Sequence, residues 1–230
     1  RTYRQSALAA REAHLDDPDN RWLARGPRLR LDSRFLRDQA LALSGLLNPE
    51  IGGPPVSPYQ PDGIWEAMSL NKNRYMRDDG PDLYRRSLYT VWRRVVAPAN
   101  FFDVPSRQTC TVKLTRTSTP LHALTTLNDV TYVEAARVWA EQLAAIPGDQ
   151  DRLARMFYAA TARHPESQEL ASLEKSLDAA RERYEANAEE AARLIAMGEA
   201  PSQQIRSDAE PAAWTTVCLM VLNLDETLCK

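Results

Sequence analysis

The apolar residues between positions 170 and 224 restrict the fold of this chain more than any other feature of the sequence. From residue 170 to residue 195 they recur at spacings of three and four, the period of a helix with one buried face. The residues of this stripe are Leu170, Leu173, Leu177, Ala180, Tyr184, Ala188, Ala191 and Ile195. The segment from Pro211 to Leu224 is apolar almost all round, which is typical of a helix inside a bundle. One long helix, or two nearly collinear ones, and a buried helix together predict a mainly α fold.

Shorter apolar stripes of the same period predict further helices. They run from Phe35 to Leu47, from Asp82 to Val95, from Tyr132 to Ile146 and from Leu153 to Ala160. In the first of them the apolar positions are Phe35, Leu36, Ala40, Leu43, Leu46 and Leu47. The chain therefore contains enough helical segments for a multi-helix bundle.

The helix near residue 35 also carries polar residues whose role the pattern leaves open. Asp32 or Ser33 is a suitable N-cap for it, because a short side-chain oxygen can accept from the first unpaired amides. Arg37, Asp38 and Gln39 follow in its first turns. They form either a solvated face with local ion pairs or the lining of a polar cleft.

Residues 48–63 contain five prolines and three glycines, including Gly52-Gly53-Pro54-Pro55. Such a segment forms neither a helix nor a central strand, because proline lacks the main-chain donor that both require. We interpret it as a loop that wraps around the helices through apolar and aromatic anchors, namely Ile51, Val56, Tyr59 and Trp65. A flexible linker is the alternative.

Composition limits the class of protein. With 29 basic and 31 acidic residues the net charge is −2, so the chain has no overall field that would attract nucleic acid. The longest apolar run, Val217 to Leu222, is far too short for a membrane span. We expect residues 1–230 to form a single helical domain, an irregular bundle with long Pro/Gly-rich loops and at most a short strand pair. The chain starts at Arg1 without a methionine or a signal-like segment, so we expect it to be the C-terminal part of a larger protein.

The stretch from Phe101 to Asp129 combines a turn, an extended segment and a helix start. Asp103 and Pro105 predict the turn, and the β-branched residues that follow up to Arg116 favour a strand over a helix. Thr119-Pro120 predicts a helix start, because proline at the first helical position loses only an amide that has no partner.

Candidate functional residues gather in the same stretch. They are Asp103, Arg107, Cys110, Arg116, Asn128 and Asp129. Arginines beside a helix N-terminus would suit an anion, but the same groups could equally support the extended segment through internal hydrogen bonds. Arg85 and Arg86 on the predicted 82–95 helix could likewise hold an anionic group or belong to a solvated face. No catalytic residue is assigned, since Cys110 has no evident histidine partner.

The cysteine and histidine residues indicate neither a haem nor a metal site. Cys110, Cys218 and Cys229 are an odd number, so at least one thiol is unpaired within the chain. Cys110 with Cys218 is the more plausible disulfide; the alternative is three reduced cysteines. The sequence has no C-x-x-C-H motif, and its histidines have no second ligand at metal spacing, so we expect no cofactor and no metal in this chain.

Several long motifs carry a resemblance to a known family. They are D-x-P-x-R-x-x-C from Asp103 and R-T-x-T-P-L-x-A-L-x-x-L-N-D from Arg116, together with RDQALALSGLLNPEIGGPPV (Arg37 to Val56), YRRSLYTVWRR (Tyr84 to Arg94) and AAWTTVCLMVLNLDETL (Ala212 to Leu228). In this order they resemble the planctomycete-specific secreted domain found downstream of cytochrome c modules, the domain-of-unknown-function family fifteen fifty-three. The resemblance covers nearly the whole chain.

The resemblance implies an exported protein of the periplasm or cell envelope, with a signal and a haem domain ahead of this region. The first hypothesis for function is therefore a non-enzymatic interaction or docking module of an exported, cytochrome-linked multidomain protein, with the upstream domains as partners. An enzyme or substrate-binding lobe acting on acidic, sulfated polysaccharide is the alternative. A third hypothesis, an adaptor for an attached haem electron-transfer domain, rests on the family's domain context alone.

Overall fold

The computed structural model describes residues 5, 7, 11–26, 28–68, 74–92, 97–105, 109–112, 114, 116–202 and 208–229. Its α-helices are α1 (Arg11–Asp16), α2 (Ser33–Leu43), α3 (Ile64–Met68), α4 (Pro120–Asn128), α5 (Val130–Leu143), α6 (Asp149–Thr161), α7 (Ser167–Ala186), α8 (Ala188–Ile195), α9 (Ala209–Leu222) and α10 (Asp225–Leu228). Extended segments within the described residues meet only in isolated bridges, Arg30–Cys229, Asn48–Arg85 and Val56–Thr90. The prediction of a mainly α bundle is confirmed.

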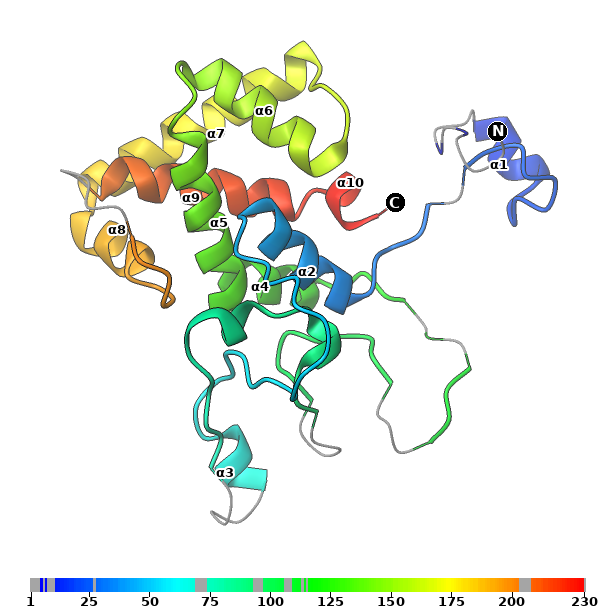
Figure 1. Ribbon diagram of the computed structural model, residues 1–230. Coiled ribbons are helices and arrows are strands. Elements are labelled where there is room, and N and C mark those ends of the chain that lie inside the picture. The colour runs from blue at the N-terminus through cyan, green and yellow to red at the C-terminus, as the bar shows by residue number, and fades with distance from the viewer. Residues whose placement is uncertain are drawn as a thin grey trace.

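Helix α9 forms the centre of the body and packs against both α5 and α7 (Figure 1). Its buried residues lie on all sides: Ala212, Ala213, Trp214, Thr215, Val217, Cys218, Leu219, Val221 and Leu222. Leu177 of α7 and Ala136 of α5 are almost fully buried in the same core. Each fully buried large aliphatic side chain contributes about 1.5–3 kcal/mol, so this helix organises the fold. The prediction of an internal helix near the C-terminus is confirmed.

The stripe from residue 170 to residue 195 becomes two helices, α7 and α8, which meet at an elbow (Figure 1). Asn187 lies between them with non-helical dihedral angles, and its side chain accepts a hydrogen bond from the main-chain N–H of Glu190 at 3.2 Å. An N-cap of this kind starts a new helix and ends the old one.

The predicted helix from Asp82 to Val95 is wrong. The described part of this segment consists of two 3₁₀ turns, Gly80–Tyr84 and Ser87–Tyr89, joined by extended residues. Its main-chain groups bind other parts of the chain: the N–H of Val56 donates to the Tyr89 carbonyl at 2.8 Å. Because tertiary contacts use these peptide groups, they are not available for helical hydrogen bonds.

The proline-rich segment wraps along these 3₁₀ turns, as predicted. The N–H of Asn48 donates to the carbonyl of Tyr84 at 2.9 Å, and Val56 and Tyr59 are buried. The predicted anchoring by Ile51 is wrong, because this residue is 85% exposed.

Besides α3, two segments project from the body (Figure 1). One, here called the arm, comprises residues 11–30; its helix α1 has no buried residue. It joins the body where the N–H of Leu31 donates to the carbonyl of Leu228 at 2.8 Å. The other is the loop between Phe101 and α4.

Candidate functional site

Asp103 closes the base of the loop that precedes α4. Its carboxylate accepts hydrogen bonds from the main-chain N–H of Thr117 at 2.6 Å and from the Thr117 hydroxyl group. Asp103 has a positive φ of 55°, a conformation that aspartate adopts more readily than most residues. His122 of α4 stacks on Phe102, with ring centroids 4.0 Å apart, and places its Nε2 atom 4.0 Å from the Asp103 carboxylate.

Arg116 supports the same loop and does not join a compact site with Asp103. Its Nη1 atom donates to the carbonyl of Arg30 at 2.8 Å, and Arg30 donates in turn to the hydroxyl of Ser118. Arg107 lies outside the described residues. Described residues nearer the tip are exposed, Val112 to 99%, and none of them forms the predicted strand.

Asn128 and Asp129 are structural residues at the junction of α4 and α5. The Asn128 amide donates to the Leu124 carbonyl within α4. Asp129 caps α5 by accepting from the Thr131 N–H at 3.0 Å, and it also accepts from the buried Asn100 side chain. Burial raises the pKa of Asp129, and the hydrogen bonds from Thr131 and Asn100 oppose that rise.

Arg85 is buried, whereas Arg86 is exposed. The Arg85 guanidinium donates to the carbonyls of Pro54 at 3.0 Å, Glu50 at 3.3 Å and Gly52. The Tyr89 ring lies 4.2 Å from its carbon Cζ. Arg86 lies 3.8 Å from the Asp38 carboxylate. The Arg85 donors therefore serve the proline-rich loop and do not face a ligand.

Arg37 is a buried residue that the sequence interpretation misplaced. It is 0% exposed, so the solvated-face interpretation is wrong for this residue. Its guanidinium donates to the carbonyls of Leu83 at 2.7 Å and Arg85 at 2.8 Å. Burial lowers the pKa of Arg37, while the nearby Asp38 carboxylate raises it. The Asp38 carboxylate also accepts from both the N–H and the hydroxyl of Ser87.

A signal for Arg37 existed in the helical spacing. The buried residues of α2 are Ser33, Leu36, Arg37, Ala40 and Leu41, a regular i, i+3, i+4, i+7, i+8 stripe. Phe35, which the hydrophobic pattern assigned to the core, is 55% exposed. The observed face therefore keeps the helical period but includes two polar residues, Ser33 and Arg37, that the hydrophobic pattern does not mark.

Glu134 of α5 forms a second buried polar cluster that the sequence interpretation missed. Its Oε1 atom accepts from the main-chain N–H groups of Glu199 and Ala200, each at 2.6 Å. The Tyr84 hydroxyl donates to the same atom at 2.9 Å and that of Tyr59 at 3.4 Å. Burial and the Glu134 charge raise the pKa of Tyr59 to about 12. The cluster ties α5 to the 198–200 turn and to the proline-rich loop.

The predicted disulfide between Cys110 and Cys218 is not formed. Cys110 is exposed on the projecting loop, and Cys218 is buried in α9. The Cys218 sulfur lies 3.5 Å from the sulfur of Met156, and burial raises the pKa of its thiol. All three cysteines are free, as the alternative prediction of reduced cysteines states, but Cys110 is exposed.

A cavity of about 440 Å³ opens between α6, α7, α9 and α10. Phe157, Leu173 and Met220 line its apolar part. Arg163 lies at its edge and pairs with Glu169 of α7 at 2.6 Å and with Glu226 of α10 at 2.8 Å. Neither at this cavity nor elsewhere do the described residues contain a group of three or more side chains suited to a metal ion.

A family model decides the membership of this chain. The model, described as PSD1, protein of unknown function (DUF1553), matches residues 1–177. The chain belongs to this family. Comparisons with curated proteins and with solved structures found no match.

The DUF1553 match ends within α7, at residue 177. The Ala212–Leu228 motif, which was assigned to the family, lies outside the matched residues. The proline-rich loop, Arg37, Arg85 and Glu134 all lie inside them. Helix α9, which fills the core, lies outside the matched residues.

Among the described residues no helix combines the length and apolar character that crossing a membrane requires.

Proposed function

We propose that this DUF1553 chain is a non-enzymatic docking module that binds a neighbouring protein domain through α4. The observation that carries the proposal is the orientation of this helix. Leu121 is 70% exposed, Leu124 57% and Leu127 38%, and the three lie on one side of α4. We call them the α4 face. A surface helix normally turns its leucines toward the core, so an outward leucine face marks an interaction surface.

Polar contacts hold α4 in this orientation. The Thr126 side chain is buried and makes a hydrogen bond with the Asn223 side chain at the end of α9. His122 stacks on Phe102 on the inner side of the same helix. Rotating α4 to bury its leucines would break these contacts, so the outward face is a stable property of the fold.

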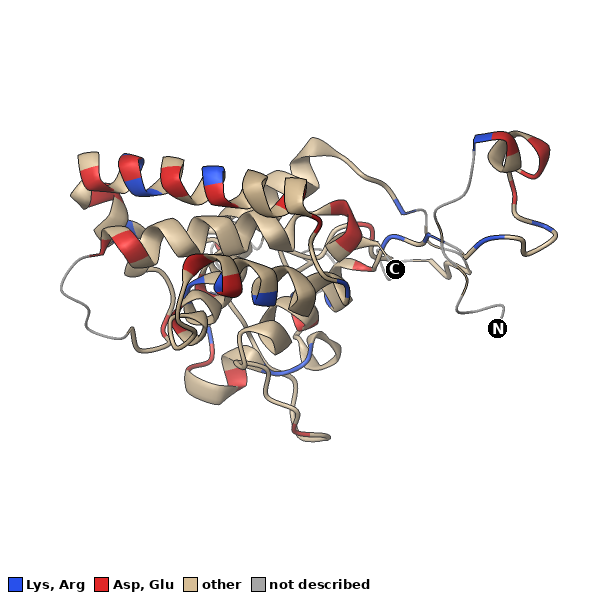
Figure 2. Cartoon of the chain, turned by 90° about the horizontal axis from the view of Figure 1, so that it is seen from above, with Lys and Arg blue, Asp and Glu red and all other residues tan. Residues whose placement is uncertain are grey.

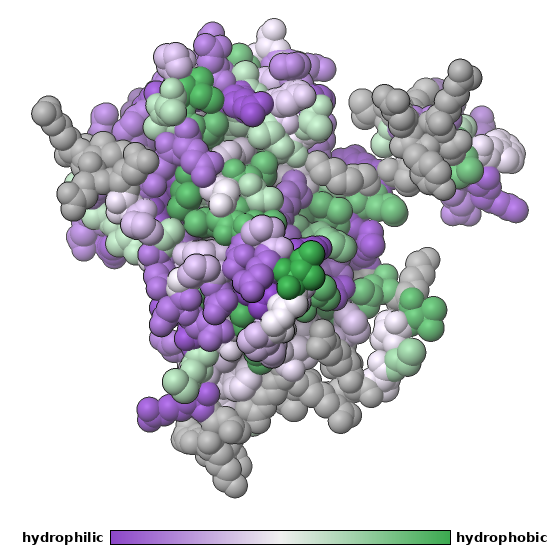
Figure 3. All heavy atoms as spheres, viewed as in Figure 1, coloured by the Kyte–Doolittle hydropathy of each residue, from purple (hydrophilic) through white to green (hydrophobic). Residues whose placement is uncertain are grey.

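The projecting loop before α4 supplies further exposed apolar surface. Figure 3 shows hydrophobic residues on the body and on the projecting loop that runs before α4. Val112 on that loop is almost fully exposed. Buried arginines that bind loop carbonyls, such as Arg85 and Arg37, stabilise the irregular part of the body as a scaffold for such a surface.

Export to the periplasm or cell envelope, and an attached haem domain as the neighbour, stay predictions from the family resemblance. Binding of acidic glycan stays a prediction too. For the glycan hypothesis Arg85 is unsuited, because its donors already bind the carbonyls of Glu50, Gly52 and Pro54.

Site-specific photo-crosslinking in the native host tests the docking proposal. Benzoylphenylalanine replaces Leu124 in one variant and the exposed Glu182 of α7 in a control variant. We expect position 124 to give one recurrent cross-linked protein segment, identified by mass spectrometry, which position 182 does not give. The same diffuse products from both positions, or cross-links from position 124 to polysaccharide only, would contradict the proposal.

A double variant separates docking from folding. Leu121→Ser combined with Leu124→Ser should abolish the contact, measured by moving the cross-linker to position 127. It should change the free energy of unfolding by no more than about 1 kcal/mol, because both side chains are exposed. The buried Leu177→Ala should cost about 2–5 kcal/mol in the same urea titration. A large loss of stability in the double variant would show that the α4 face is part of the core.

A further inference from the structure

The cavity between α6, α7, α9 and α10 is suited to an apolar side chain that has a positively charged residue next to it in the chain. Phe157 is 3% exposed and Leu173 8%, so the apolar floor is deep, while Met220 at 39% borders the opening. A volume of about 440 Å³ lies in the range that proteins use for ligand pockets. An indole ring with an adjacent aliphatic side chain is of suitable size.

The rim of this cavity carries three carboxylates and two guanidinium groups, a net charge of −1. The body contributes three carboxylates, Glu169, Asp225 and Glu226, and one guanidinium, that of Arg163. Figure 2 shows acidic residues close to the C-terminus and basic residues along the extended part of the arm. Arg28, at the base of the arm, already pairs with Asp225 on the rim. Arginine from the arm is therefore complementary to this rim.

The arm presents the matching groups. Trp22 is 76% exposed and Leu23 56%, and both follow Arg21. Residues 21–30 contain four arginines and no acidic residue. Tryptophan and arginine are the residues that most often dominate the energy of protein interfaces. The apolar side chains of Trp22 and Leu23 are unfavourable in water, so their exposure favours a partner that would cover them.

Internal hydrogen bonds hold the Trp22 turn in shape. The Asp17 carboxylate accepts from the N–H groups of Arg21 at 2.8 Å and Trp22 at 3.0 Å. The Arg25 guanidinium donates to the carbonyls of Asp17 and Pro18. The turn is therefore a preorganised unit.

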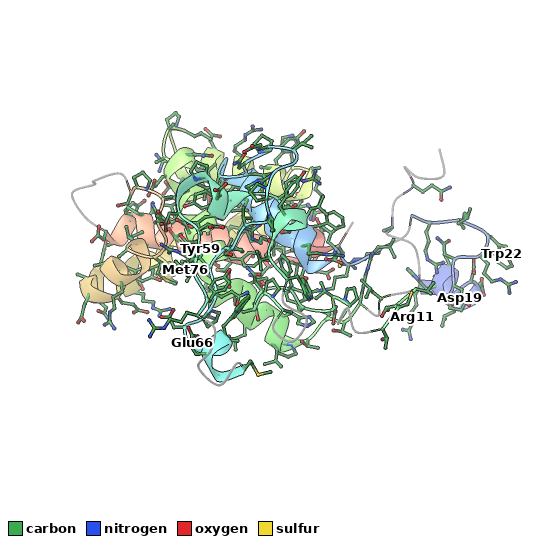
Figure 4. The ribbon with its side chains drawn as sticks, turned by 60° about the horizontal axis from the view of Figure 1, so that its bottom comes forward. Arg11, Asp19, Trp22, Tyr59, Glu66 and Met76 are labelled. Atoms are coloured by element: carbon green, nitrogen blue, oxygen red, sulfur yellow. The ribbon has the colours of Figure 1, made fainter. Side chains whose placement is uncertain are left out.

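The position of this turn favours a second copy of the chain over the cavity of the same chain. Figure 4 shows Trp22 at the outer end of the arm, on the side remote from the body. To reach its own cavity, the arm would have to turn back toward the body before Leu31 and displace Arg28 from Asp225. The arm of a second copy can enter without any such change. Projecting arms next to an open cavity are the arrangement from which arm-exchanged dimers form.

We propose that two copies of this chain associate by arm exchange, in which Trp22 and Leu23 of each copy insert into the α6–α7–α9–α10 cavity of the other. Arg21 of the inserted arm then faces the acidic rim. This interface is separate from the α4 face, and either proposal can fail without the other.

Sedimentation equilibrium of the full chain measures the association. We expect a monomer–dimer equilibrium whose dissociation constant rises at least tenfold in Trp22→Ala. The matched control is Leu88→Ala, which removes an equally exposed apolar side chain, 72% against 76%, outside both the arm and the cavity. A chain that stays monomeric at all concentrations, or a dimer that both substitutions weaken equally, would overturn the proposal.

Cysteine cross-linking identifies whose arm occupies the cavity. In a background of Cys110→Ser and Cys229→Ser, one preparation carries Leu23→Cys, which keeps Trp22, and the other carries Ser176→Cys at the cavity wall. On mixing and oxidation we expect a disulfide between position 23 of one chain and position 176 of the other, identified by peptide mass spectrometry. If the mixture gives none, while a chain with both substitutions closes an internal disulfide, the occupant is the chain's own arm and exchange is refuted.

Discussion

Single arginine residues hold the irregular parts of this molecule together. The pattern recurs in residues that bind main-chain carbonyl groups of distant segments: Arg25 with Ala13, Asp17 and Pro18, Arg37 with Leu83 and Arg85, Arg85 with Glu50, Gly52 and Pro54, and Arg137 with Ala200. A guanidinium has five donors in a fixed plane, so one side chain can satisfy several carbonyls that no helix or sheet would satisfy. Loops with many prolines need such partners, because they have few amides of their own.

The neighbouring pair Arg85 and Arg86 tests this role. Arg85→Ala leaves the carbonyls of the proline-rich loop without their donor and should lower the free energy of unfolding by about 2–4 kcal/mol. Arg86→Ala removes an exposed side chain with one long ion pair and should change it by about 0.5 kcal/mol or less. Urea unfolding followed by circular dichroism measures both. Equal effects would show that the Arg85 contacts contribute nothing to stability.

Gly198 is required by the buried Glu134 carboxylate. A Cβ atom at position 198 would lie 2.4 Å from atoms of the Glu134 side chain, and the residue has a φ of 91°. Gly198→Ala should therefore cost about 2–4 kcal/mol, from the left-handed backbone and from the collision. The control is Gly63→Ala, with a φ of 80° and open space around it, which should cost only about 1–2 kcal/mol. Thermal unfolding compares the two, and similar costs would show that Glu134 moves aside easily.

At the scale of elements, Arg163 joins three helices near the cavity. It follows α6, and its guanidinium binds Glu169 of α7 and Glu226 of α10 with two hydrogen bonds each. These pairs link helices that are separate in sequence, and they border the opening that the arm-exchange proposal uses. The pairing with Arg163 lowers the pKa of Glu169 to about 2.

Acid titration tests this link between α6 and α7. A carboxylate whose pKa is lower in the folded than in the unfolded chain stabilises the fold above its unfolded pKa of about 4.5. That contribution is lost as the pH falls from about 5 toward 2. Glu169→Gln should therefore lose less stability than the unsubstituted chain over this range, measured by urea unfolding at each pH. The contribution of Asp129 to the pH dependence of stability has the opposite sign, because burial raises its pKa. Asp129 is present in both proteins, so this contribution cancels when their stabilities are compared.

Glu182→Gln is the control for this titration, since Glu182 lies exposed on the same helix α7. It should follow the unsubstituted chain at every pH. If Glu169→Gln also follows it, the Arg163 pair contributes no net stability, as is common for ion pairs that water reaches.

For the whole molecule, helical periodicity predicted most of the body. The stripes ending at Ile146 and Ala160 correspond to α5 and α6, and the apolar tail corresponds to α9. Each of these segments has a face whose spacing matches the helix period, and burial of that face is what stabilises it. The 82–95 stripe has the same spacing, yet its peptide groups bind the proline-rich loop and Arg37. Periodicity alone does not distinguish these two outcomes.

The candidate site was predicted less well than the fold. Asp103 and Arg116 do support the loop before α4, by binding Thr117 and Arg30, but they do not form one cluster with Asn128 and Asp129. Glu134 was missed because nothing next to it in sequence marks it. Its partners, Tyr59, Tyr84 and the 199–200 amides, are 50 or more residues away.

The sequence by itself determined where the chain can be helical, where proline forbids it, and that α9 lies inside, because these properties depend on residues within a few turns of one another. Only the tertiary structure decided which polar groups are buried and which leucines face water. Arg37 and Leu121 both lie on amphipathic helices, but the first is inside and the second outside. The burial of a side chain depends on what distant segments offer it: Arg37 finds carbonyl partners inside, whereas the inner side of α4 is occupied by contacts of Thr126 and His122.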